Sequence, residues 1–182
     1  VEAVARFYAN QGGEQPVEPP PSPATGGPEY TPELDVSRDC FRLWGTRGSI
    51  PVPGGRFARH GGNTSCMEIR TGEEVIVLDA GSGIRDLGSL LMPDGPRKLT
   101  VFITHTHWDH IQGLPFFIPH FIPGNTLRIH GAYDPIGQQD IREILSGQMS
   151  YCSFPVRDAE LKADLVYKTL KERDSVQVGS AT

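Results

Sequence analysis

Short apolar or alternating runs, separated by glycine- and proline-rich breaks, recur along the chain from residue 40 onward. Apolar residues at helical spacing predict one helix through 84–91 and another over 138–146. The runs of strand length predict strands at 41–44, 64–70, 74–78, 99–103, 127–132 and 165–170, with shorter β-like stretches at 154–156 and 175–178. The pattern therefore indicates an α+β domain.

The strand at 99–103 lacks strict alternation, which is typical of a strand covered on both faces. Four side chains able to bind a metal follow it within six residues: His105, His107, Asp109 and His110. Two residues apart on an extended backbone, His105 and His107 point the same way, while Asp109 and His110 come at the expected start of a helix. Imidazoles suit zinc, and a carboxylate–imidazole pair suits zinc, manganese or iron. We interpret the cluster as a metal site rather than a structural histidine or a surface metal trap.

The segment 104–110, Thr-His-Thr-His-Trp-Asp-His, resembles the signature His-x-His-x-Asp-His of the metallo-β-lactamase-fold hydrolases. Segment 74–83 is similar to that family's earlier strand, which ends in Asp and Gly. Segments 45–51 and 60–66 resemble a narrower, phosphodiesterase-like branch. The resemblance extends over roughly residues 40–182. It implies an α+β fold in the form of a four-layer αββα sandwich, of which this chain carries mainly the first βα half.

The resemblance also implies a site with two divalent metal ions, zinc above all, with manganese or iron as alternatives. His105 and His107 would bind the first ion, and Asp109 and His110 the second. Asp109 would also be catalytic, orienting the attacking water. The family's further ligands cannot be placed, because no histidine follows His130. We therefore expect the remaining half of the fold to lie elsewhere, and expect self-association or a complementary chain to complete it.

The function that the resemblance favours is hydrolysis of a cyclic nucleotide, a cyclic phosphate or an RNA-type phosphodiester. Two alternatives stay open. The first is hydrolysis of another ester, a thioester or a lactam on the same fold. The second is a non-catalytic fragment that binds a metal or a partner through an incomplete site. On either enzymatic hypothesis, this segment alone would be inactive if its missing ligands are essential.

Two residues outside the histidine motif have a functional and a structural interpretation. Asp79 follows the strand at 74–78, and the resemblance implies that it braces the metal ligands by hydrogen bonds. Its structural interpretation is a cap of the following helix, and the two roles can coexist. In the resembling branch Asn63 would line the site, whereas its sequence context alone indicates a turn. For His130 a core position is expected, and the apolar segment 114–124 around His120 is expected to pack against the core.

Residues 1–38 contain few groups that could form a core. A short helical pattern at 1–10 is followed by a stretch crowded with glycine and proline, including three consecutive prolines at 19–21. This composition predicts an arm or linker over 1–38, with a proline-rich ligand as the alternative, and a domain over 39–182.

Composition narrows the class of protein only slightly. The 182 residues carry a formal net charge of -5, which gives no bulk attraction to nucleic acid or to an anionic membrane. Cys40, Cys66 and Cys152 are odd in number and widely spaced, which favours free thiols in a reducing compartment. The cytoplasm is therefore the expected compartment. No apolar run is long enough to span a membrane, so no membrane partner is expected.

Overall fold

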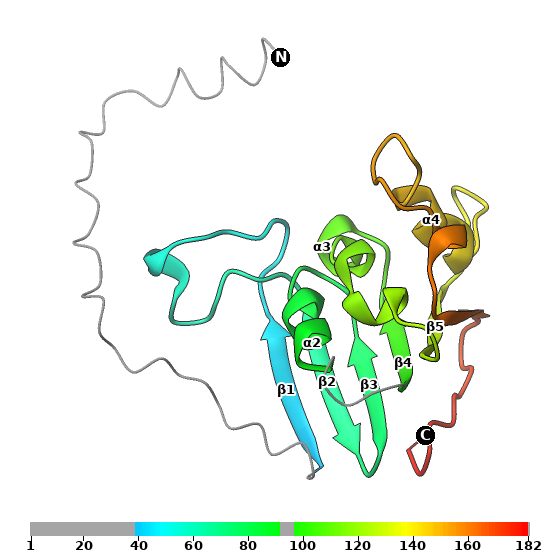
Figure 1. Cartoon of the computed structure of the whole chain (residues 1–182), viewed down its shortest axis with the longest axis horizontal. Helices are drawn as coiled ribbons and strands as arrows, with labels where there is room; N and C mark the ends of the chain where they lie inside the picture. Colours follow the sequence, from blue (N-terminus) through cyan, green and yellow to red (C-terminus); the bar gives the residue numbers. More distant parts are fainter. Residues whose placement is uncertain (1–38, 92–96, 182) are drawn as a thin grey trace. The chain divides into compact units, whose positions relative to one another are not determined.

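The computed structural model describes residues 39–91 and 97–181, and the predicted arm over 1–38 lies outside them. Within these residues one mixed sheet has its strands in chain order (Figure 1). The strands are β1 (Cys40–Gly45), β2 (Cys66–Thr71), β3 (Glu74–Leu78), β4 (Lys98–Ile103), β5 (Thr126–Ala132) and β6 (Asp164–Leu170). β1, β2 and β3 pair antiparallel, whereas β3, β4, β5 and β6 pair parallel.

Helices connect the parallel strands, as parallel pairing requires. The α-helices are α2 (Ile84–Leu91), α3 (Trp108–Ile111) and α4 (Ile141–Gln148). Short 3-10 turns are η1 (Gly55–Phe57), η3 (Leu114–Phe116), η4 (Ile118–Phe121) and η5 (Asp158–Glu160). None of the helices within the described ranges is long and apolar enough to cross a membrane.

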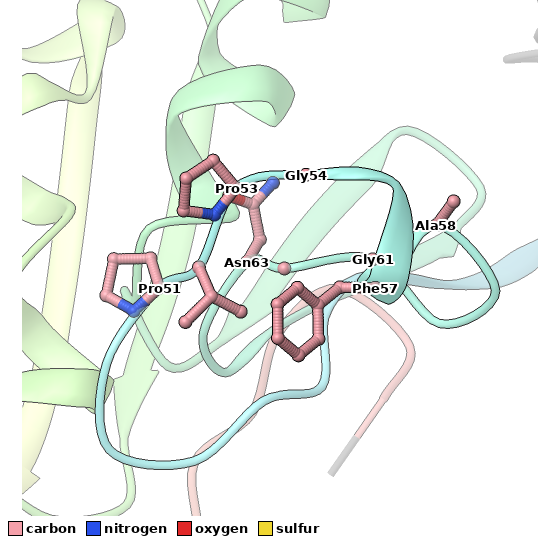
Figure 2. Close-up of a pocket in the computed structure, with 9 residues that line it drawn as sticks. Pro51, Pro53, Gly54, Phe57, Ala58, Gly61 and Asn63 are labelled. Atoms are coloured by element: carbon pink, nitrogen blue, oxygen red, sulfur yellow. The ribbon is translucent and has the colours of Figure 1, made fainter. Parts of the chain in front are cut away.

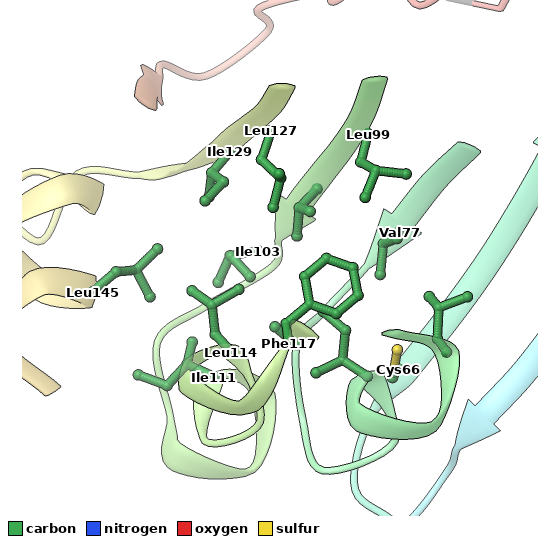
Figure 3. Close-up of a cluster of buried hydrophobic side chains, with 14 of the residues drawn as sticks. Cys66, Val77, Leu99, Ile103, Ile111, Leu114, Phe117, Leu127, Ile129 and Leu145 are labelled. Carbon is green, nitrogen blue, oxygen red and sulfur yellow. The ribbon is translucent and has the colours of Figure 1, made fainter. Parts of the chain in front are cut away.

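The core lies between one face of the sheet and these helices (Figure 3). Leu99, Val101, Leu127 and Ile129 project from the central strands, and Phe117 packs against them with no exposed surface. The segment 114–124 forms η3 and η4 and contributes Phe117 to the core, as expected from its apolar character. The apolar run of β4 is therefore buried where the hydrophobic pattern predicted it.

The opposite face of the sheet is buried at its centre, at Ile76, Thr100 and His130, and exposes apolar side chains at its two edge strands. Cross-strand partners share a face, and here Phe41 is opposite Ile69 while Leu43 is opposite Met67. Phe41 is 61% exposed and Leu43 is 52% exposed. Val166 of β6, which pairs with Arg128 on the same face, is 45% exposed.

Two predicted β segments are wrong. Residues 154–156 form no strand, because Pro155 has no N–H to donate and the N–H of Phe154 donates to the Ser150 carbonyl at 2.9 Å. Residues 175–178 contribute only an isolated bridge between Val178 and Ala181. These two residues exchange both backbone hydrogen bonds at 2.9 Å, so they close a tight turn instead of extending the sheet.

The helix predicted over 138–146 begins later, at Ile141. Asp140 is its N-cap, and its side chain accepts a hydrogen bond from the Glu143 N–H at 2.8 Å. The Glu143 side chain accepts in return from the Asp140 N–H at 2.8 Å. This reciprocal capping box fixes the start of α4.

Candidate metal centre

The imidazoles of His105, His107 and His110 lie next to one another, at the carboxyl end of β4 and in α3. The ring centroids of His105 and His107 are 4.6 Å apart, and those of His105 and His110 are 4.0 Å apart. His105 and His107 are exposed, whereas His110 is partly buried. The segment after β4 thus gathers three imidazoles beside Asp109.

Asp79 lies behind this cluster, with its side chain almost fully buried. Its Oδ1 accepts hydrogen bonds from the Thr104 N–H at 2.9 Å and the Thr104 hydroxyl at 2.8 Å. Its Oδ2 accepts from the Ser65 hydroxyl at 3.0 Å and lies 2.7 Å from Nδ1 of His110. A φ of 63° at Asp79 turns the chain out of β3 in the left-handed region. It is not an N-cap, since α2 begins only at Ile84.

These contacts determine which ring nitrogen carries the proton in His110 and in His105. A carboxylate only accepts, so Nδ1 of His110 donates to Asp79 and Nε2 keeps its lone pair. The single hydroxyl proton of Thr104 goes to Asp79, so Thr104 Oγ1 accepts from Nδ1 of His105 at 3.1 Å. The Nε2 lone pairs of His105 and His110 are therefore both free to bind an ion.

Asp109 is held by a residue from a distant part of the chain. The backbone N–H of Ser49 donates to its Oδ2 at 2.8 Å. This hydrogen bond, with His110 and His105 acting in the same direction, lowers the pKa of the Asp109 carboxyl below its ordinary value. Asp109 is therefore a carboxylate at neutral pH, as a metal ligand must be.

The chemical types of these donor groups suit a divalent ion, and one pair of donor atoms also has a suitable separation. Nε2 of His110 is 3.5 Å from Oδ2 of Asp109. Two ligand atoms on one tetrahedral zinc ion lie about 3.3 Å apart, given Zn–N and Zn–O distances near 2.1 Å. Within the described part of the chain, no three His, Cys, Asp or Glu side chains are already placed to hold an ion together. His105 and His107, both exposed, are the candidates for further ligands.

Gly81 allows the chain after β3 to pack against the histidine motif. A Cβ at this position would lie 2.3 Å from the Asp109 carbonyl oxygen and 2.6 Å from the Ser65 carbonyl oxygen. The Ala80 N–H donates to the His110 carbonyl at 2.7 Å, which fixes the same contact. Only glycine permits this approach, and it sets the position of Asp79 relative to His110.

Asn63 contacts residues of the neighbouring α2 region. Its amide donates to Asp86 at 3.1 Å, and its side-chain carbonyl accepts from the Ser82 hydroxyl at 3.1 Å. Its backbone carbonyl accepts from the N–H of Arg47 at 3.0 Å, which anchors the loop that carries Ser49. The hydrogen bonds of Asn63 thus position that loop and include no imidazole, so its role in lining the site stays a prediction.

Three residues that contact the cluster or Asp79 were given no role from the sequence: Ser49, Ser65 and Thr104. Thr104 is adjacent to the histidine motif, and its position was the available signal. Ser49 and Ser65 lie in the glycine-rich segments that carry the resemblance, but no spacing rule connects them to Asp109 or Asp79.

A family profile described as the metallo-beta-lactamase superfamily matches residues 59–167, which is more than half of the chain. The chain belongs to the metallo-β-lactamase superfamily. It is similar to the crystal structure of the metallo-beta-lactamase fold protein YhfI from Bacillus subtilis, with a TM-score of 0.50 and 16% identity over 76% of this chain. The fold class predicted from the resemblance is thereby confirmed.

Two curated relatives are both named as thioesterases. One is the acyl-coenzyme A thioesterase MBLAC2 of Gallus gallus, 38% identical over 71 residues, or 34% of this chain and 26% of that protein. The other is the atrochrysone carboxyl ACP thioesterase of Aspergillus chevalieri, 33% identical over 141 residues, or 75% of this chain and 42% of that protein. The chain spans less than half the length of these relatives and 48% of the YhfI chain.

Proposed function

We propose that the full-length protein is a metal-dependent hydrolase that uses the cluster of His105, His107, Asp109 and His110. The observation that carries this proposal is the pair of contacts behind the cluster, Asp79 to His110 and Ser49 to Asp109. Hydrogen bonds that orient a histidine and a carboxylate from behind are typical of metal ligands. Zinc is the ion that the donor set suits best, with manganese or iron as alternatives.

The chemistry supplied by divalent ions in such a site is activation of water and polarisation of the substrate's carbonyl or phosphoryl oxygen. The residues of this chain orient the histidine and carboxylate groups that would take part. Asp79 keeps the proton on Nδ1 of His110, so that Nε2 stays a ligand. Ser49 holds one oxygen of Asp109, which leaves the other to accept a hydrogen bond from the attacking water.

We propose a thioester as the substrate. Both curated relatives described above are named thioesterases, and the one from Aspergillus chevalieri aligns over 75% of this chain. A thioester also suits the chemistry, since a polarised carbonyl and an oriented water are what its hydrolysis requires. This replaces the phosphodiester as our first hypothesis.

A phosphodiester is the second candidate, and one observation favours it. Segment 45–51, which carries the resemblance to the phosphodiesterase-like branch, contains Ser49. The Ser49 N–H reaches Asp109 directly, so this segment lies at the candidate centre and not at a remote surface.

The test is an assay of the full-length protein, loaded with zinc or manganese, on a short-chain acyl-CoA, bis-nitrophenyl phosphate and a chromogenic lactam. We expect thioester hydrolysis that is lost in Asp109→Ala and retained in Glu172→Ala, an exposed acid after β6. Turnover of the phosphate ester alone would select the second candidate. Full activity in Asp109→Ala would overturn the proposed site.

A further inference from the structure

The loop between β1 and β2 is strongly basic in an acidic protein. Residues 46–63 contain Arg47, Arg56, Arg59 and His60 and no aspartate or glutamate, whereas the whole chain has a net charge of -5. None of the three guanidinium groups contacts a carboxylate in the described part of the chain. The positive charge of this loop is therefore available to an external anion.

The basic side chains surround a cavity. It has a volume of about 370 Å³, and its lining includes Arg47, Arg56, Phe57, Arg59 and His60. The guanidinium of Arg47 lies 4.9 Å from the centroid of the Phe57 ring, and that of Arg56 lies 5.7 Å from it. Stacking on the same ring holds two planar cations at one site, an arrangement that suits the oxygens of a phosphate.

A second, mainly apolar cavity is drawn in Figure 2, and it shares Phe57 and Gly61 with the basic one. Its volume is about 480 Å³, within the range of about 300–1,000 Å³ usual for small-molecule sites. Pro51, Val52, Pro53 and Ala58 are among its apolar lining residues. The ring of Phe57 thus lines both a cationic cavity and a mainly apolar one.

Backbone hydrogen bonds close the loop on itself, and one further hydrogen bond links it to the histidine motif. The N–H of Val52 donates to the Gly62 carbonyl at 3.0 Å, and the N–H groups of Thr46 and Arg47 donate to the Asn63 carbonyl. Ser49, two residues after Arg47, donates to Asp109 and is held at φ 72°, a conformation that costs a serine free energy. Arg47 and Gly48, which line the basic cavity, are therefore directly followed in the chain by the residue that contacts Asp109.

We propose that this loop binds the nucleotide phosphate of the substrate, with the phosphate in the basic cavity and the base in the apolar one. The part of the substrate that lies outside these two cavities would then be beside Asp109. This assignment of a substrate class rests on the proposed hydrolase function. The nucleotide could belong to the CoA part of an acyl-CoA or to an RNA, since both present the same phosphate chemistry.

The first experiment measures binding without hydrolysis. Calorimetry on the full-length protein would compare 3′-phosphoadenosine 5′-phosphate, CoA and a short single-stranded RNA. We expect Arg56→Gln/Arg59→Gln to weaken binding about tenfold or more, since charge-assisted hydrogen bonds to phosphate are lost. Arg56→Lys/Arg59→Lys should recover part of the affinity. The control Arg142→Gln/Arg157→Gln removes the same charge from α4 and the segment before η5, and should leave binding unchanged.

Equal binding by the wild type and Arg56→Gln/Arg59→Gln, or an equal loss in the control, would overturn the proposal. Tighter binding of CoA than of the RNA identifies CoA as the source of the phosphate, and the reverse identifies RNA. A second experiment measures kcat/KM of the wild type and of Arg56→Gln/Arg59→Gln on an acyl-CoA and on a phosphate-free N-acetylcysteamine thioester. The substitutions should lower kcat/KM more for the acyl-CoA. Arginine-dependent binding without any hydrolysis would contradict the proposed function and leave the phosphate site standing.

Discussion

Oδ2 of Asp79 lies 2.7 Å from Nδ1 of His110, and this contact joins the end of β3 to the histidine motif that follows β4. Because Oδ1 of the same carboxylate accepts both protons offered by Thr104, one buried side chain orients two segments at once. The carboxylate thereby fixes the tautomer of His110 directly and that of His105 through Thr104.

We predict that Asp79→Asn lowers metal affinity. An amide that still accepts from Thr104 must turn its NH₂ group toward His110, where it meets the Nδ1 proton. His110 would then move its proton to Nε2 and lose the lone pair that binds the ion. We expect affinity to fall about 10- to 100-fold, measured by competition with a chromogenic chelator.

The control for Asp79→Asn is Ser65→Ala, which removes one hydrogen bond to the same carboxylate and leaves its charge and acceptors. Its effect on metal affinity should be clearly smaller. If Asp79→Asn keeps its native circular dichroism and binds metal as tightly as the wild type, Asp79 does not orient the ligand.

Substitution by alanine should change the free energy of unfolding in opposite directions at Gly81 and at Gly147. An added Cβ at Gly81 would overlap the carbonyl oxygens of Asp109 and Ser65, so Gly81→Ala should destabilise the fold by about 1–3 kcal/mol. At Gly147, inside α4, a Cβ meets nothing within 4 Å. Gly147→Ala should therefore stabilise by about 0.5–1 kcal/mol. Urea unfolding measures both, and similar effects of the two substitutions would refute the close packing at Gly81.

His120 should make stability depend on acid pH. Burial lowers its pKa to about 4, although the hydrogen bond between its Nδ1 and the Leu114 carbonyl acts in the opposite direction. Between pH 4 and 6.5 the unfolded chain binds a proton at this residue and the folded protein does not. The free energy of unfolding therefore falls as pH falls through this window, by up to about 3 kcal/mol.

The measurement is urea unfolding of the wild type and of His120→Gln at several pH values between 4 and 7. An amide can still donate to Leu114 but does not titrate. Other histidines, including His130, whose pKa burial also lowers, contribute equally to both proteins. Parallel curves of unfolding free energy against pH for the two proteins would show that His120 is not responsible.

Several features of the fold were predictable because they depend on local pattern. The apolar run of β4 and the helical spacing of α2 correspond to buried faces, and hydrophobic periodicity reports burial directly. The histidine motif was predictable for a similar reason, since four potential ligands within six residues need no tertiary information. Its use in binding a metal stays a prediction.

The features that were not predictable depend on contacts between distant residues. Ser49 and Asp109 are 60 positions apart, and the hydrogen bond uses a backbone N–H, which every residue except proline possesses. The 154–156 segment was misassigned because its apolar residues suggested a strand, whereas Phe154 packs its ring against Phe116 at a centroid distance of 5.3 Å. A half-buried aromatic side chain in a loop gives the same sequence pattern as one in a half-buried strand.

The exposed apolar side chains of β1 lead to a last prediction. Leu43 is 52% exposed on the face of the sheet opposite the core, and the chain spans 48% of the similar YhfI chain. We propose that the remaining half of the superfamily's fold, in the full-length protein, covers Leu43 and its neighbours. Leu43→Asp would then bury a charge and should destabilise the full-length protein by several kcal/mol. Ile136→Asp is the control, because Ile136 is 94% exposed in a loop before α4. Thermal unfolding compares the two variants, and a Tm for Leu43→Asp equal to that of Ile136→Asp would mean that this face stays in contact with water.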